Sequence, residues 1–70
     1  MKKIIIQSDY ITIGQFLKFT GIISSGAMAK TYLNENIIYV NKEIENRRGR
    51  KLYKGDIIQI NKDYFEIGKV

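Results

Sequence analysis

A chain of 70 residues is long enough for one small domain with a thin core. It contains no cysteine and no histidine, which excludes disulfide bonds, the usual zinc sites and the usual general base at neutral pH. Its net charge of +5, from 12 basic and 7 acidic residues, indicates an acidic or polyanionic partner.

The first predicted element is a short strand at Lys3–Ile6. The apolar run ends at once in Gln7, Ser8 and Asp9, whereas a secretory signal needs about 7–15 apolar residues. No stretch approaches the roughly 20 apolar residues that span a bilayer. We therefore expect a soluble, cytoplasmic protein that does not bind a membrane.

Two helices are expected next. Thr12 and Gln15 have the spacing of a capping box, and Gly21 stands where a helix C-cap belongs. Between them, one helical face is formed by Ile13, Phe16, Leu17 and Thr20. A second helix is expected from a cap at Ser24 or Ser25 to about Asn34, with an apolar face formed by Met28, Ala29, Tyr32 and Leu33.

The rest of the chain has the composition of strands. Segment 46–54 is expected to be an exposed extended loop that Leu52 anchors in the core. The expected strands are Ile37–Val40, Glu43–Glu45, Ile57–Ile60 and Tyr64–Ile67, with turns at 41–42, 54–56 and 61–63. This order predicts an α+β fold in a single domain (1–70), in which a helix pair packs on a small antiparallel sheet.

The basic residues are concentrated in one segment, 47–54, which has the sequence RRGRKLYK and no acid. Outside it, basic and acidic residues balance. Clustered arginines bind phosphates through several N–H groups, so we favour polyanion binding over a merely solvated loop. Gly49 has two equally good interpretations, a position with positive φ or a flexible loop residue. The candidate phosphate ligands are Arg47, Arg48, Arg50, Lys51 and Lys54.

Other candidates lie outside this cluster or are not charged. Ser25 and Gly26 open the second helix, where free N–H groups can bind phosphate, although ordinary capping explains them better. Lys30 and Lys42 can extend the basic surface, and Tyr53 can stack on a base. Asn41 and Asp56 are expected to serve turns. Six other aromatic residues are expected mostly in the core: Phe16, Phe19, Tyr32, Tyr39, Tyr64 and Phe65.

These features together resemble a known family. Residues 12–60, with TIGQFLKFTGIISSGAMAKTYL, IIYVNKE and KGDIIQI, are similar to the αL RNA-binding domain of ribosomal small-subunit protein four. The stretch ENRRGRKL at 45–52 resembles the stand-alone bacterial YaaA-type members. The resemblance implies an αL helix pair and binding of structured RNA, ribosomal or transfer RNA, in ribosome association or maturation.

The sequence therefore predicts a non-catalytic RNA-binding protein, with ribosomal RNA or the ribosome as partner. The carboxylates are dispersed, so we expect no catalytic residue, no metal, no cofactor and no small-molecule substrate. Two alternatives stay open: a helix-turn-helix-like DNA-binding protein, and a module that docks on an acidic protein.

Overall fold

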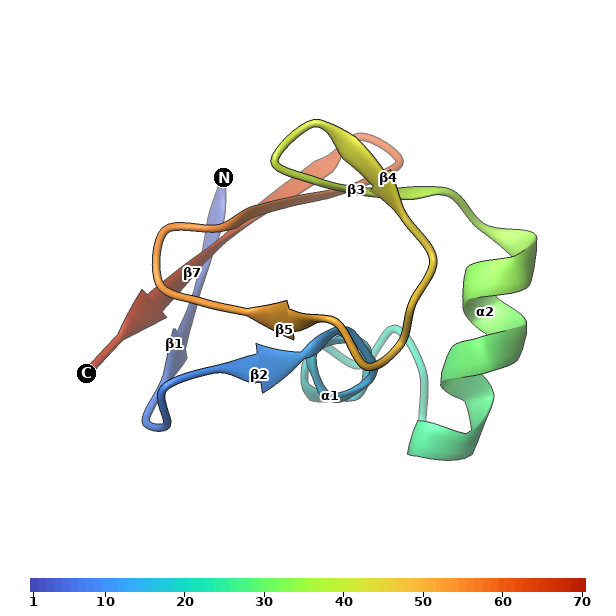
Figure 1. Cartoon of the computed structure of the whole chain (residues 1–70), viewed down its shortest axis with the longest axis horizontal. Helices are drawn as coiled ribbons and strands as arrows, with labels where there is room; N and C mark the ends of the chain where they lie inside the picture. The colour runs from blue at the N-terminus through green and yellow to red at the C-terminus, as the bar shows by residue number, and fades with distance from the viewer.

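Five strands form the main sheet of the protein, which is described here by a computed structural model of residues 1–70 (Figure 1). The order across this sheet is β1-β7-β6-β3-β4. The elements are β1 (Lys2–Ile6), β2 (Ile11–Thr12), α1 (Ile13–Phe19), a 3₁₀ turn (Gly26–Met28), α2 (Ala29–Glu35), β3 (Ile38–Val40), β4 (Glu43–Glu45), β5 (Lys51–Leu52), β6 (Ile57–Ile60) and β7 (Asp63–Lys69). The α+β prediction is thus confirmed.

The sheet is antiparallel except at one edge. β1 pairs in parallel with β7, so that Ile4 lies opposite Ile67. A parallel pair needs a long connection, which here is formed by both helices and the strands between them. The predicted antiparallel sheet is therefore confirmed except at this pair, and β7 is longer than predicted because it pairs with β6 as well as β1.

A second, two-stranded ribbon was not predicted. β2 and β5 pair antiparallel, with Ile11 opposite Leu52 and Thr12 opposite Lys51. Leu52 is fully buried, as expected of an anchor. The ribbon connects the beginning of α1 to the end of the basic segment, and Figure 1 shows the two strands side by side next to α1.

Both predicted ends of α1 are confirmed. The Thr12 hydroxyl accepts a hydrogen bond from Gln15 N, and the Gln15 side chain accepts one from Thr12 N, which completes the capping box. At the other end, Gly21 has a φ of 82° and Ile22 N–H donates to the Leu17 carbonyl at 3.0 Å. This is a Schellman ending, and its left-handed position favours glycine.

The start of α2 differs from the prediction. The helix begins at Ala29, after the 3₁₀ turn, and neither serine caps it: Ser25 makes no side-chain cap bond, while the Ser24 hydroxyl donates to Met28 Sδ. Met28 was expected on the buried face but is exposed, because it belongs to the turn that precedes the helix. Ala29 and Leu33 are buried as predicted.

One cluster of 14 apolar residues fills the space between the helices and the sheet, with the Phe16 and Phe65 rings packed edge to face. Two aromatic residues predicted for the core, Phe19 and Tyr64, are exposed instead. Phe19 lies off the buried stripe of α1, and strand alternation directs Tyr64 away from the face that buries Phe65. No helix has both the length and the apolar character needed to cross a membrane.

Candidate nucleic-acid interface

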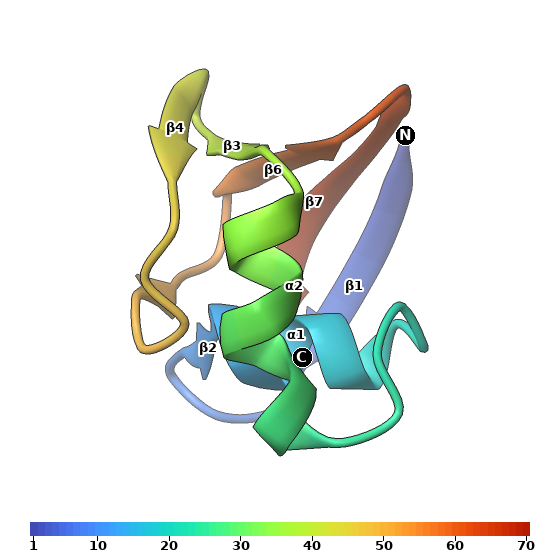
Figure 2. The same cartoon turned by 90° about the vertical axis from the view of Figure 1, so that its right-hand side faces the viewer.

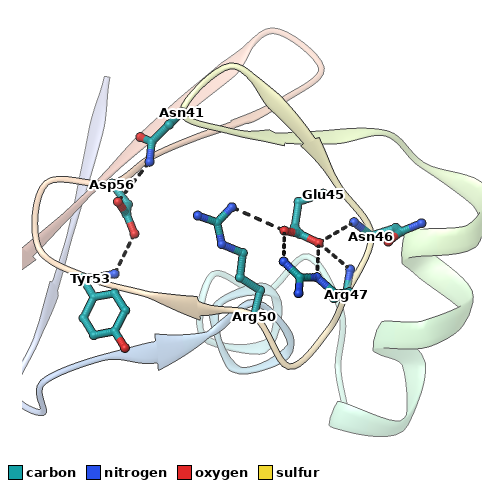
Figure 3. A network of polar contacts seen from close by, with 7 residues as sticks. All are labelled: Asn41, Glu45, Asn46, Arg47, Arg50, Tyr53 and Asp56. Carbon is teal, nitrogen blue, oxygen red and sulfur yellow. Dashed lines mark hydrogen bonds and ion pairs between the residues drawn. The ribbon is translucent and has the colours of Figure 1, made fainter.

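The arginine loop, residues 46–50, connects β4 to β5 and is organised around Glu45 (Figure 3). Glu45 is the last residue of β4 and is only 8% exposed. Its carboxylate accepts hydrogen bonds from the backbone N–H groups of Asn46 and Arg47, from Arg47 Nε and Nη2 at 3.0 Å each, and from Arg50 Nη1 at 3.4 Å. The chain therefore folds back around one buried negative charge.

The electrostatics of this cluster favour the ionised carboxylate. The Arg47 side-chain N–H groups lower the pKa of Glu45 to about 2, although burial partly offsets them. In return, hydrogen bonding to Glu45 raises the pKa of Arg47. Residues 45–54 thus hold five cations and one anion, so the segment has a net charge of +4.

The backbone of the arginine loop is also fixed, by the first turn of α1. Ile13 N–H donates to the Arg50 carbonyl and Gly14 N–H to the Arg48 carbonyl, both at 2.9 Å. Such N–H groups have no partner within their own helix. The loop is therefore held in one shape. Gly49 does not have the positive φ considered from the sequence.

The five predicted cations differ in their exposure. Arg48, Lys51 and Lys54 are exposed, and the Arg47 side chain is 74% exposed despite its ion pair. Arg50 was expected to be exposed, but its side chain is only 28% exposed because it reaches back to Glu45. Arg47 and Arg50 thus have a structural role, whereas Arg48, Lys51 and Lys54 have no ion-pair partner within the chain.

The arginine loop meets the first turn of α2 at Gly14. A Cβ atom on Gly14 would lie 3.6 Å from Ala29 Cβ and 3.8 Å from Arg48 Cβ, so both segments lie against Gly14. Figure 2 shows α2 in front of α1, with the loop to one side. The fold therefore brings Arg48 near Ala29, the first residue of α2. Ser25 and Gly26, at the 3₁₀ turn that precedes α2, and Lys30 in its first turn are exposed.

Lys42 lies apart from this group, at the opposite end of β4. It follows Asn41 in a two-residue turn where both residues have left-handed φ values, 50° and 73°. The Asn41 amide donates to Asp56 Oδ1 at 3.0 Å, and its oxygen accepts from Ile57 N. Asn41 and Asp56 serve turns, as predicted, and they also tie two turns together.

Tyr53 is half-exposed, as expected, and has a neighbour that the sequence interpretation missed. Its ring centroid lies 6.0 Å from that of Tyr10, and Lys51 Nζ lies 4.8 Å from the Tyr10 ring. Asp56 Oδ2 accepts a hydrogen bond from Tyr53 N at 2.8 Å. The β2–β5 pairing, which was not predicted, is what brings these two tyrosines together.

Comparisons with known proteins agree with this geometry. Residues 4–68 match the S4 domain family. The chain is also 54% identical, over 55 residues, to a Bacillus subtilis (strain 168) protein named "Probable ribosome maturation protein RlbA". That alignment covers 79% of this chain and 78% of the relative. The protein therefore belongs to the S4 domain family.

Proposed function

We propose that the protein binds structured RNA without catalysing a reaction, and that residues 1–70 act as one RNA-binding unit. The observation that carries the proposal is the arginine loop, a positively charged segment held in one shape by Glu45 and the first turn of α1. Membership of the S4 domain family and the ribosome maturation name of the relative support ribosomal RNA as the partner, within the cytoplasm.

A fixed loop suits a rigid partner such as a folded RNA. Ordering a long side chain or a loop on binding costs free energy, and a loop already held by hydrogen bonds avoids part of that cost. The phosphates of a folded RNA also have a fixed spacing, so a matching spacing of cations adds selectivity. We therefore expect a structured RNA to bind better than an unstructured strand of equal length.

We assign the strongest contacts to Arg48 and Lys54, whose charges no carboxylate neutralises and which, unlike Lys51, do not lie over an aromatic ring. Arg47 and Arg50 contribute as parts of the Glu45 cluster, with Arg47 the more exposed of the two. Secondary contacts come from Lys51, Tyr53, Lys30, Ser25 and Gly26, and Lys42 is the most peripheral candidate.

The helix-turn-helix alternative has less support. α2 would be the recognition helix, but it is seven residues long and Lys30 is its one basic residue. The strongest positive charge lies on a loop between strands instead. Docking on an acidic protein is supported only by the positive charge. The experiment below distinguishes it from RNA binding.

The test compares three probes by fluorescence anisotropy at one salt concentration: a ribosomal RNA hairpin, a DNA duplex of equal length, and oligo-uridine. We expect the hairpin to bind most tightly. Arg48→Glu should weaken that binding by about tenfold or more, because a phosphate contact is replaced by repulsion. Lys3→Glu makes the same charge change on β1, at the sheet edge opposite β4, and should have little effect.

Tighter binding of the DNA duplex would favour the DNA-binding alternative. No binding to any probe, together with complexes in a lysate that survive nuclease treatment, would favour an acidic protein partner. If Arg48→Glu and Lys3→Glu reduced the affinity for the hairpin equally, binding would depend on the total charge of the protein and not on the arginine loop.

A further inference from the structure

Tyr10 and Tyr53 form a cross-strand pair on the outer face of the β2–β5 ribbon. The register that pairs Ile11 with Leu52 and Thr12 with Lys51 continues to Tyr10 and Tyr53. Successive side chains of a strand point to opposite faces, so the side chains of Ile11 and Leu52 point toward the core and those of the two tyrosines point away from it. Leu52 is fully buried, whereas Tyr10 is 40% exposed and Tyr53 is 49% exposed.

The backbone on both sides of this pair is fixed. The Ser8 hydroxyl donates to the Tyr10 carbonyl at 2.8 Å, and Asp56, itself bound to Asn41, accepts from Tyr53 N. Figure 3 shows the Tyr53 ring directed away from the Asp56 side chain that holds its backbone. The two rings therefore form a preformed aromatic surface, and neither belongs to the apolar core.

The surroundings of the pair are cationic. Lys51 Nζ lies over the Tyr10 ring at 4.8 Å, Lys54 follows Tyr53 directly, and the arginine loop leads into the same ribbon. Aromatic rings beside lysine ammonium groups match the chemistry of a nucleotide, because a base stacks on a ring while its phosphate pairs with a cation. This combination distinguishes the pair from exposed Tyr64, which has no lysine or arginine over its ring.

We propose that Tyr10 and Tyr53 stack an unpaired nucleobase that projects from the structured RNA, with Lys51 and Lys54 on its phosphates. This inference rests on the proposed function and narrows its ligand. A base within a duplex is covered by its neighbours, so the RNA must present a bulged or loop nucleotide next to the helix that the arginine loop contacts.

The test uses two RNA hairpins that differ in one bulged nucleotide, an adenosine in one and an abasic residue in the other. Both carry the same phosphates, so the difference between them reports the base alone. Stacking predicts that the wild-type protein binds the adenosine hairpin at least about fivefold more tightly. The double variant Tyr10→Leu/Tyr53→Leu should lose this preference and bind both hairpins as the wild-type protein binds the abasic one.

Tyr64→Leu, which removes an exposed tyrosine at the β6–β7 hairpin, should keep the preference. Circular dichroism verifies that the variants are folded, and the wild-type comparison needs no variant. Equal wild-type binding of the two hairpins, or a preference that the double variant retains, would overturn the inference and leave the RNA-binding proposal intact. Failure of the wild-type protein to bind either hairpin would overturn both.

Discussion

Glu45 shows how a single carboxylate can shape a basic surface. It stands at the end of β4, is nearly buried, and accepts hydrogen bonds from the backbone and side chain of Arg47 and from the side chain of Arg50. Without it, two guanidinium groups would repel each other in one short loop. Its negative charge therefore lowers the net charge of the loop while it fixes the loop's conformation.

The first prediction concerns Glu45→Gln. A glutamine has one oxygen acceptor and no charge, so the hydrogen bonds from Arg47 weaken and some donors lose their partner. We expect the free energy of unfolding at neutral pH to fall by about 2 kcal/mol, the usual scale for hydrogen bonds to a charged group. Glu43→Gln is the matched control, because Glu43 is on the same strand but exposed, and it should change stability by less than about 0.5 kcal/mol. Urea denaturation of both variants makes the comparison, and equal effects would contradict the role given to Glu45.

The same carboxylate predicts a pH dependence. Its pKa is about 2 in the folded protein against an ordinary 4.5, so it stabilises the fold fully above the unfolded value. That contribution should decline as the pH falls from about 4.5 to about 2. A hydrogen bond from Lys69 also lowers the pKa of Asp9. Asp9 therefore changes stability with pH in the same direction, but its contribution is small because the pair is exposed and screened by salt.

Urea denaturation at several pH values tests this. The stability difference between the wild-type protein and Glu45→Gln should shrink steadily below about pH 4.5, while Asp9 affects both proteins equally. A difference that stays constant over that range would mean that Glu45 is not the titrating group.

The sequence could identify the basic cluster but not the acid that organises it. In the stretch Glu43-Ile44-Glu45, alternation suggests a buried isoleucine between two exposed acids, yet Ile44 is 66% exposed and Glu45 is buried. β4 is an edge strand whose following loop reaches over it, so the side chain facing that loop is enclosed. Only the three-dimensional path of residues 46–50 reveals this.

At the scale of elements, the basic segment is held by α1 and by the β2–β5 ribbon. The capping box and the glycine ending of α1 are local patterns, which is why the sequence predicted them correctly. The ribbon consists of two strands of two residues each, too short for any periodicity. The docking of loop carbonyls on Ile13 and Gly14 also joins residues more than 30 positions apart, which no local pattern encodes.

The prediction at this scale compares two neighbouring residues of β5. Leu52→Asp puts an unpaired charge at a fully buried position, which is costly enough to unfold a domain of this size. Lys51→Asp changes the charge more, by two units, but at an exposed position, and should leave the domain folded. Thermal melts followed by circular dichroism distinguish the two. A cooperative melt for Leu52→Asp close to that of the wild-type protein would show that β5 does not anchor the loop.

At the scale of the whole molecule, the chain closes on itself through β1 and β7, which pair in parallel although they come from opposite ends of the sequence. Their pairing completes the sheet on the side opposite β4. The arginine loop follows β4, at the other edge, and docks on the first turn of α1. The tyrosine pair lies by the end of β1, where Tyr10 lines a groove together with Ile5 and Ile6. The sheet thus acts as a support, and the arginine loop is separated from the β1 edge.

The last prediction follows from this distribution of charge. If the net charge of +4 on residues 45–54 neutralises about four phosphates, the logarithm of the RNA association constant should fall with the logarithm of salt concentration at a slope of about −3. Arg48→Gln removes one unpaired cation and should reduce the magnitude of that slope by about 1. Lys3→Gln removes one cation from β1, at the far edge of the sheet, and should leave the slope unchanged. Anisotropy titrations of the three proteins at four salt concentrations give the slopes. An affinity independent of salt would mean that phosphates are not the main contacts. Equal slopes for all three proteins would mean that Arg48 does not contact a phosphate.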